Sequence, residues 1–207
     1  MTEPKKEESS ARPSSGRAFL SRTEKSLRCA PFGRGVSMPG LEAHLIFWPL
    51  MAVGITLDLW SKRAVFQWLH QQQSNSISII DGFLRLVEAR NPGAAFGIAA
   101  GQRYLLVGVS VIALMVIFWI FLFSGTERRL VHIALGLFAA GVCGNLYDRI
   151  FNNDGSVRDF IDVVYWPGKH WPAFNVADGL LCIGVGLMFF SAFFTRKSSP
   201  GRAQQHK

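Results

Sequence analysis

Charged residues are scarce in this chain: Asp, Glu, Lys and Arg make up 17% of its 207 residues, whereas 49% are hydrophobic. Soluble domains carry charge on about a quarter of their residues, so this composition argues against an ordinary soluble fold. Several apolar stretches are about 20 residues long, the length that an α-helix needs to cross about 30 Å of hydrocarbon. The sequence therefore predicts a multi-pass membrane protein.

Cysteine is also rare, and Cys29, Cys143 and Cys182 show neither a disulfide framework nor metal-ligand spacing. The first 40 residues lack the apolar segment of a cleavable secretion signal. The formal net charge is +8, but the Lys and Arg residues sit mainly in two tails and one short loop, without a basic face interleaved with aromatic residues. This distribution argues against nucleic-acid binding.

The N-terminal region, residues 1–40, is rich in Ser, Pro, Gly, Lys, Arg and Glu. Such a composition cannot bury enough apolar surface to fold, so we expect a disordered tail. Recognisable patterns begin after Met38, which makes Met38 a candidate for the true start, testable by mass spectrometry of the natural N-terminus. Residues 41–195 form the expected membrane domain, and residues 196–207 form a cytoplasmic C-terminal tail.

Four apolar stretches predict four transmembrane helices, at about residues 45–60, 104–123, 130–147 and 174–194. The third is rich in Gly and Ala, which let helices approach closely in lipid, so we expect it to be the inner helix. Between the first two spans, Asp81-Gly82 separates two strand-like runs. The expected fold is an all-α membrane protein with a small extracytoplasmic β-hairpin or sheet at about residues 70–101.

Positive charge predicts the orientation, because Lys and Arg near span ends are retained in the cytoplasm. The N-terminal tail, Arg128-Arg129 and Arg196-Lys197 all fall on one side of a four-span topology. Both termini are therefore expected in the cytoplasm. The hairpin and the loop of residues 151–173 are then expected to face outward.

Two aspartates are the main candidates for chemistry. Asp178 lies four residues into the fourth span, where an ionisable side chain is costly and usually marks function, and Asn175 shares its helix face. Asp159 lies in VRDFID, and it would meet Asp178 if that segment packs against the head of the last helix. Two close carboxylates share one proton near neutral pH, as water-mediated peptide hydrolysis requires. A helix-capping role for Asp178 would also explain its position.

Further polar residues gather near the outer ends of two spans. Asp58 and Lys62 have the spacing of a helical ion pair, for which a structural role is the simpler interpretation. The third span ends with Asn145, Asp148 and Arg149. Either a polar site or anchoring at the membrane interface would account for these three residues.

The loop NPGAAFG, residues 91–97, follows the expected hairpin directly. Its glycines and small side chains permit close approach of the backbone to a ligand. A plain turn would have a similar composition, so the loop by itself leaves both interpretations open.

Five motifs resemble, in order and spacing, those of lipoprotein signal peptidase, the type II signal peptidase of bacteria. They are DLWSK (58–62), NPGAAFG (91–97), GVCGNLYDR (141–149), VRDFID (157–162) and FNVADG (174–179). The resemblance covers roughly residues 44–195. It implies a four-helix fold in the bacterial cell (inner) membrane with both termini cytoplasmic and the active site at the extracytoplasmic face.

In that family, the aspartates that match Asp159 and Asp178 form the catalytic dyad of an aspartyl protease that uses no metal or other cofactor. The family removes the signal peptide from a prolipoprotein, cutting just before a cysteine that already carries diacylglycerol. The resemblance also implies that Asp58 and Lys62 are structural. It further implies a group of polar residues that bind substrate or stabilise the site: Asn91, Gly93, Asn145, Arg149 and Asn175.

Three positions depart from the family pattern. Leu59 stands where Gln is usual, Pro92 where Thr is usual, and Gly179 where Ser is common. None of the three removes a carboxylate of the expected dyad, so they affect only the expected local hydrogen bonding.

Two other functions would also make use of polar residues near the span ends. An ion or proton-coupled transporter would relay charge through Asp178, Asp148 and Arg149. Against this, the second span contains no ionisable group, and the polar candidates lie at one face rather than along a path. A catalytically silent scaffold would tolerate substitution of both candidate aspartates.

Overall fold

The computed structural model of this chain describes residues 38–94 and 97–194. Within these residues, four helices are long and apolar enough to cross a membrane: α2 (Leu41–Gln71), α3 (Arg103–Phe123), α4 (Arg129–Phe151) and α5 (Val176–Phe194). Apart from residues 38–40, the expected N-terminal tail lies outside the described part of the chain, and so does the expected C-terminal tail. The described residues therefore contain the four predicted membrane helices.

Helix α2 is longer than the apolar stretch that predicted the first span. It continues for 31 residues through Pro49, Asp58 and Lys62 to Gln71. Both charged side chains are fully buried, and they form an ion pair with each other. The ion pair compensates both buried charges, so the helix can continue beyond the apolar stretch.

Helix α4 is the inner helix of the bundle, as predicted. Half of its membrane-spanning window, 50%, is buried, whereas the corresponding value is 17% for α3 and for α5. Small residues make this possible: a Cβ atom at Gly141 would lie only 2.6 Å from the backbone oxygen of Ala177 on α5. On the other side of α4, a Cβ at Gly136 would lie 3.1 Å from the backbone oxygen of Phe47 on α2.

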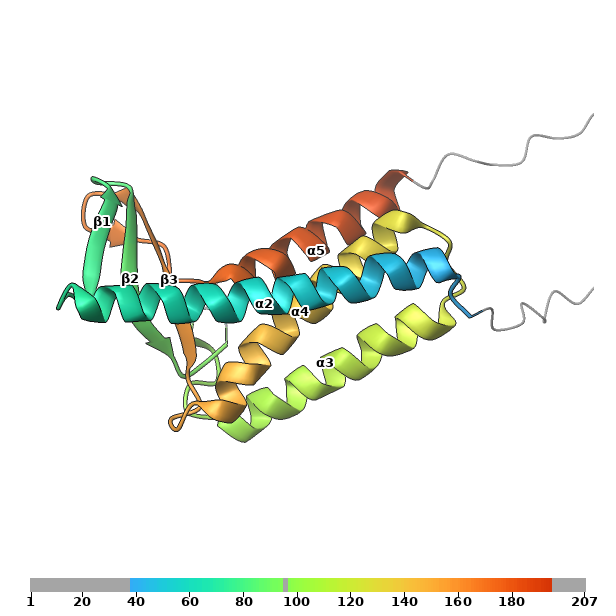
Figure 1. The fold of residues 1–207 in the computed structure, drawn as a ribbon, viewed down its shortest axis with the longest axis horizontal. Helices are drawn as coiled ribbons and strands as arrows, with labels where there is room; N and C mark the ends of the chain where they lie inside the picture. The colour runs from blue at the N-terminus through green and yellow to red at the C-terminus, as the bar shows by residue number, and fades with distance from the viewer. Residues whose placement is uncertain (1–37, 95–96, 195–207) are drawn as a thin grey trace, which may run out of the picture. The chain divides into compact units, whose positions relative to one another are not determined.

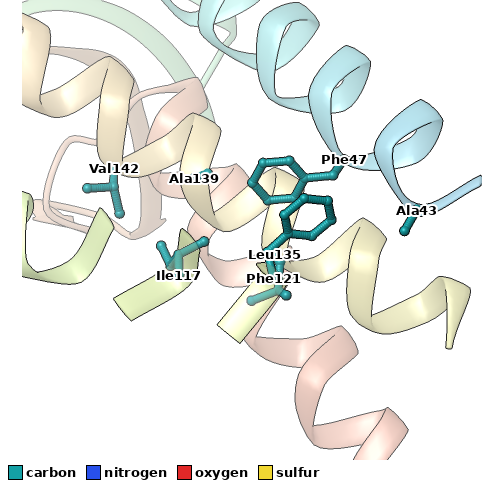
Figure 2. Packing of buried hydrophobic residues seen from close by; sticks show 7 residues of the cluster. All are labelled: Ala43, Phe47, Ile117, Phe121, Leu135, Ala139 and Val142. Atoms are coloured by element: carbon teal, nitrogen blue, oxygen red, sulfur yellow. The ribbon is translucent and has the colours of Figure 1, made fainter. Parts of the chain in front are cut away.

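The apolar core lies where α2, α3 and α4 meet (Figure 2). Phe47 of α2 stacks on Phe121 of α3, with ring centroids 4.1 Å apart and planes 18° from parallel. Leu135 and Ala139 of α4 complete the contact, and all four side chains are buried. Aromatic stacking and close packing hold this region, because lipid supplies no hydrophobic force between helices.

A small antiparallel sheet lies at one end of the four helices (Figure 1). Its order is β1 (Ser76–Ile80), β2 (Leu84–Asn91), β3 (Val157–Trp166) and β4 (Lys169–His170). The first two strands form the predicted hairpin, and Gly82 in their turn has a φ of 73°, which favours glycine.

The connection between α4 and α5, expected as a loop over residues 151–173, contains two strands that the sequence analysis did not predict. Strand β3 occupies ten of these residues, and it pairs with β2, placing Ala89 opposite Asp159. The sequence VRDFIDVVYW is rich in β-branched and aromatic residues, which favour strands. Its partner lies about 70 residues earlier in the chain, so local pattern alone did not reveal the pairing.

Candidate active site

The start of helix α5 is fixed by two residues that hydrogen-bond to each other. The backbone N–H of Asp178 donates to Oδ1 of Asn175 at 3.0 Å, and the backbone N–H of Asn175 donates to Oδ2 of Asp178 at 3.1 Å. This reciprocal pattern is a capping box. The capping role expected as an alternative for Asp178 is therefore present, and it engages one carboxylate oxygen.

The second oxygen of Asp178 faces the neighbouring helix α4. Oδ1 accepts a hydrogen bond of 2.9 Å from the side-chain amide of Asn145. Asp178 is half-buried and lines a pocket together with Asn145. Asp178 can thus cap the helix and line the pocket at the same time.

Strand β3 brings Asp159 to the same place. The side-chain amide of Asn175 donates to Oδ1 of Asp159 at 2.6 Å and to Oδ1 of Asn145 at 3.1 Å. Asn175 is fully buried, so its hydrogen bonds are made without competition from bulk water. One asparagine therefore contacts both candidate aspartates, through its side chain on Asp159 and through its backbone on Asp178.

Burial raises the pKa of Asp159 to about 7, and the nearby charge of Asp178 adds to this rise. Hydrogen bonds from the side chains of Asn175 and Asn91 act in the opposite direction. Asp159 is only 2% exposed, so loss of hydration outweighs these hydrogen bonds. At neutral pH, the Asp159 carboxyl group is therefore divided between its protonated and charged forms.

Lys62 lies behind the two aspartates at the centre of a buried ionic network. Its Nζ is 2.7 Å from Oδ2 of Asp58 and 3.2 Å from Oδ2 of Asp148, and it donates to Oδ1 of Asn145 at 3.0 Å. An ammonium has three donors, and three acceptors surround this one. Asp58 in turn accepts a 2.8 Å hydrogen bond from the backbone N–H of Ala177, which ties α2 to the first turn of α5.

Asp148 connects this network to strand β3 through Arg158. Its Oδ1 accepts hydrogen bonds of 2.6 Å and 3.1 Å from the guanidinium of Arg158, and its Oδ2 accepts one of 3.0 Å from the backbone N–H of the same residue. Three hydrogen bonds thus fix the residue that immediately precedes Asp159. The sequence had not singled out Arg158, because its role depends on the position of β3.

The end of β2 contributes Asn91, and the loop that follows it contributes Gly93. Oδ1 of Asn91 accepts a 2.9 Å hydrogen bond from the backbone N–H of Gly93, and the backbone oxygen of Gly93 accepts one of 3.0 Å from Arg149. A Cβ at Gly93 would lie 2.8 Å from the backbone of Gly97 and of Ile98. A side chain at this position would therefore collide with the backbone of its own loop.

A pocket of about 900 Å³ opens in front of the two aspartates. Its polar lining includes Asp159, Asp178, Asn145, Arg149 and Asn91. Most of the remaining lining is apolar, with Trp171, Pro172, Phe174 and Leu181 among its members. The pocket therefore combines a few converging polar groups with apolar walls, as binding sites for small or extended ligands do.

A family model described as "Signal peptidase (SPase) II" matches residues 50–194 of this chain. This chain belongs to the signal peptidase II family. A curated "Lipoprotein signal peptidase" of Rhodopirellula baltica is 33% identical over 184 residues, covering 82% of this chain and 81% of that protein. The protein of the same description from Geobacter sulfurreducens is 40% identical over 148 residues, covering 70% of this chain and 89% of its own length.

The solved structures agree with the family assignment. Two structures described as a bacterial membrane enzyme are each 25% identical to this chain, with TM-scores of 0.64 and 0.61. They cover 84% and 80% of this chain and 100% of their own chains. Together with the four apolar helices, this similarity makes the chain a multi-pass membrane protein of the signal peptidase II family.

The residues that the sequence analysis selected fall into two groups in the structure. Asp159, Asp178, Asn91, Asn145 and Arg149 line the pocket. The others support it from behind: Asp58, Lys62 and Asn175 are fully buried, and Gly93 holds Arg149 through its backbone oxygen. The apolar walls around Trp171 and Leu181 were not predicted, since nothing in the sequence distinguishes them from other interfacial or spanning residues.

Two of the three departures from the signal peptidase II pattern, Pro92 and Gly179, also line the pocket. A Cβ at Gly179 would meet no atom within 4 Å. The serine that the family pattern favours would therefore fit at this position, and glycine leaves more room beside Asp178.

Proposed function

We propose that this chain is an aspartic endopeptidase that removes signal peptides from prolipoproteins by cutting just before a diacylglyceryl-modified cysteine. It lies in the bacterial inner membrane with both termini in the cytoplasm. The sheet and the pocket then face the extracytoplasmic side, where the substrate's cysteine is presented. The distribution of Lys and Arg supports this orientation, since Arg128 and Arg129 stand at the start of α4 and this end of α4 lies away from the sheet (Figure 1).

The observation that carries the proposal is the pair formed by Asp159 and Asp178. Both line one pocket, and a single buried asparagine contacts both of them. Asp159 has a raised pKa of about 7, so it can hold a proton when Asp178 is charged. Two carboxyl groups with one proton between them supply both the base and the acid for water-mediated peptide hydrolysis.

In this mechanism, the carboxylate of Asp178 removes a proton from a water molecule, whose oxygen attacks the carbonyl carbon of the scissile peptide bond. The protonated carboxyl of Asp159 donates its proton to the carbonyl oxygen, giving a tetrahedral diol. Asp178 then gives its proton to the leaving nitrogen, while one diol hydroxyl returns a proton to Asp159. The C–N bond breaks, the signal peptide leaves with a new carboxyl group, and both aspartates regain their starting states.

The surroundings of the pair suit these roles. Asp178 accepts hydrogen bonds from the side chain of Asn145 and the backbone of Asn175, and such donors stabilise a carboxylate. Arg149 lines the same pocket and is anchored on the backbone oxygens of Gly93 and Asn145. The apolar walls of the pocket match a substrate that consists of a hydrophobic signal peptide and a lipidated cysteine.

The test is cleavage of a diacylglyceryl-modified prolipoprotein by the purified protein in lipid vesicles. Asp159→Asn and Asp178→Asn should each lower kcat by about a thousandfold or more, since each removes the base or the acid. Each variant keeps a side chain of nearly the same size. We therefore expect both to insert, and to elute from a sizing column as the wild type does.

Asp81→Asn is the matched control, because Asp81 is exposed in the turn between β1 and β2. It should cleave at the wild-type rate. Turnover by either Asn variant at a rate comparable to that of the control would exclude the pair as the catalytic machinery and would favour a catalytically silent scaffold. Cleavage of the same precursor without its lipid, at an undiminished rate, would contradict the proposed substrate.

The transporter considered from the sequence is not supported. The family model and the two relatives named above are described as signal peptidases. Asp148 and Arg149, which a charge relay would need to use, are held in place by Lys62, Arg158 and the backbone of Gly93. Their partners give them a fixed structural role.

A further inference from the structure

Strands β3 and β4 share a side-chain contact that lies outside the site described above. Nδ1 of His170 lies 3.0 Å and 2.9 Å from the two carboxylate oxygens of Asp162. The side chain of Asp162 is only 9% exposed, and that of His170 is 39% exposed. A ring nitrogen that faces both oxygens of a carboxylate acts as an N–H donor, and a protonated ring adds charge attraction.

The chain immediately after His170 forms one wall of the pocket. Trp171, Pro172, Ala173 and Phe174 all line it. The far end of this wall is held firmly, since the backbone of Phe174 exchanges three hydrogen bonds of 2.9 to 3.1 Å with Phe160 and Ile161. At the near end, the backbone N–H of Trp171 donates to the oxygen of Val163 at 2.8 Å, and Pro172 has no N–H to add.

The contact between His170 and Asp162 adds a side-chain hydrogen bond at the near end of the wall, where the backbone of His170 also pairs with Val164 of β3. Asp162 has a second cationic neighbour, Arg85 of β2, whose Nη1 lies 3.9 Å from its Oδ2. Arg85 and Asp162 are also directly opposite each other in the strand register. Without the imidazole of His170, the carboxylate of Asp162 therefore still has the guanidinium of Arg85 nearby. Loss of the imidazole should accordingly shift the wall without unfolding the sheet.

We propose that His170 is a positioning residue for substrate binding, which holds the wall of residues 171–173 in place through its contact with Asp162. The proposal rests on the function proposed above, in that the substrate is the lipidated precursor. His170 is not among the described residues that line the pocket, so it would act on the substrate only through the wall. It should accordingly affect the binding of substrate and leave the chemical step unchanged.

The first test compares KM and kcat for a diacylglyceryl-modified precursor. His170→Ala should raise KM by about three- to tenfold while kcat stays within about twofold, since a partly exposed charge-assisted contact is lost and the aspartate pair is intact. His170→Gln should restore most of the affinity, because its side-chain amide can still donate to Asp162. The matched control is His70→Ala, which removes an imidazole that pairs with Glu88 of the same sheet at 3.4 Å.

These results can overturn the proposal in three ways. An unchanged KM for His170→Ala excludes a positioning role, and so does a fall in kcat at constant KM. If His170→Gln is as impaired as His170→Ala, the hydrogen bond to Asp162 is not the cause. An equal rise in KM for His70→Ala would show that any loss of an imidazole at the sheet has this effect.

A second measurement does not depend on cleavage, and so separates failure of this proposal from failure of the proposed function. Hydrogen–deuterium exchange of the intact protein in lipid should show the amide of Trp171 exchanging about tenfold faster in His170→Ala, and near the wild-type rate in His170→Gln. Unchanged exchange in the Ala variant overturns the proposal. If wild type cleaves no precursor, the function is wrong, whereas the role of His170 in holding the wall stands or falls on the exchange rates.

Discussion

The two halves of the helix bundle are held together by different forces. Near the start of α2, Phe47 stacks on Phe121 and packs against α4 without polar partners from its side chain. Near the sheet, α2 and α4 meet through Lys62 of α2, which forms ion pairs with Asp58 of α2 and with Asp148 of α4. Apolar packing is tolerant of small rotations, whereas ion pairs fix direction. The half that carries Asp159 and Asp178 is thus the half whose geometry is set by directional contacts.

The largest effect should come from breaking the polar half. Lys62→Met leaves the buried carboxylate of Asp58 without its cation, which should cost about 3–5 kcal/mol of unfolding free energy. The exposed pair of Arg129 and Glu42 at the opposite end is the matched control, and Arg129→Met should cost less than about 1 kcal/mol. Unfolding by denaturant in detergent micelles measures both values, and equal losses would refute the contrast between the two halves.

The apolar half should respond to a cavity. Phe47→Ala removes a fully buried ring from the core, and we expect a loss of about 2–4 kcal/mol of unfolding free energy. Because the site lies in the other half, kcat at a temperature where the variant is folded should match that of wild type. Val109→Ala, which alters an exposed position of α3, serves as the control. A large fall in kcat for folded Phe47→Ala would show that the two halves are coupled.

Two glycines of α4 allow a finer comparison. A Cβ at Gly144 would lie 2.4 Å from Oδ2 of Asp58 in the polar half, whereas a Cβ at Gly136 would lie 3.1 Å from the backbone oxygen of Phe47 in the apolar half. Gly144→Ala should cost about 1–3 kcal/mol and also lower cleavage, because it displaces the ion pair behind the site. Gly136→Ala should cost less and leave cleavage unchanged. The reverse order in the cleavage assay would contradict a directional role for the polar half.

The smallest expected change in unfolding free energy is the change per pH unit that comes from the titration of Asp159. Its pKa is raised from the ordinary 3.8 to about 7, so the folded protein binds this proton more tightly than the unfolded chain. Stability should be greatest below about pH 4 and fall by up to about 1.4 kcal/mol per pH unit until pH reaches about 7. Unfolding measured at pH 5 and 6 should show this slope in wild type, and Asp159→Asn should remove it. The same slope in the variant would assign the titration to another group.

Helical features of this chain could be predicted because their signals are local. The charge-free run in α3 and the spacing of Asp58 and Lys62 each depend on residues within a few turns of one helix. The contact between Arg158 and Asp148 could not be predicted in this way, although only ten residues separate them. It requires β3 to be a strand, and β3 is a strand because it pairs with distant β2. The loop of residues 91–97 was likewise left open between a turn and a ligand-binding segment, since the contacts of Gly93 with the backbone of Gly97 and Ile98 depend on the fold of the loop.

The hydrogen bonds of Asn175 restrict which side chain can stand at this position. Its oxygen accepts from the N–H of Asp178, while its nitrogen donates to Asp159 and to Asn145. A rotation of the amide by half a turn would set oxygen against oxygen at Asp159 and Asn145 and one N–H against another at Asp178, so only one orientation is tolerated. An aspartate of identical shape would still accept from Asp178, but it would set oxygen against oxygen at Asp159 and Asn145 and would add a further charge. A substitute of the same size is therefore not sufficient at this position. It must also place a hydrogen-bond acceptor and a donor where the oxygen and nitrogen of Asn175 lie.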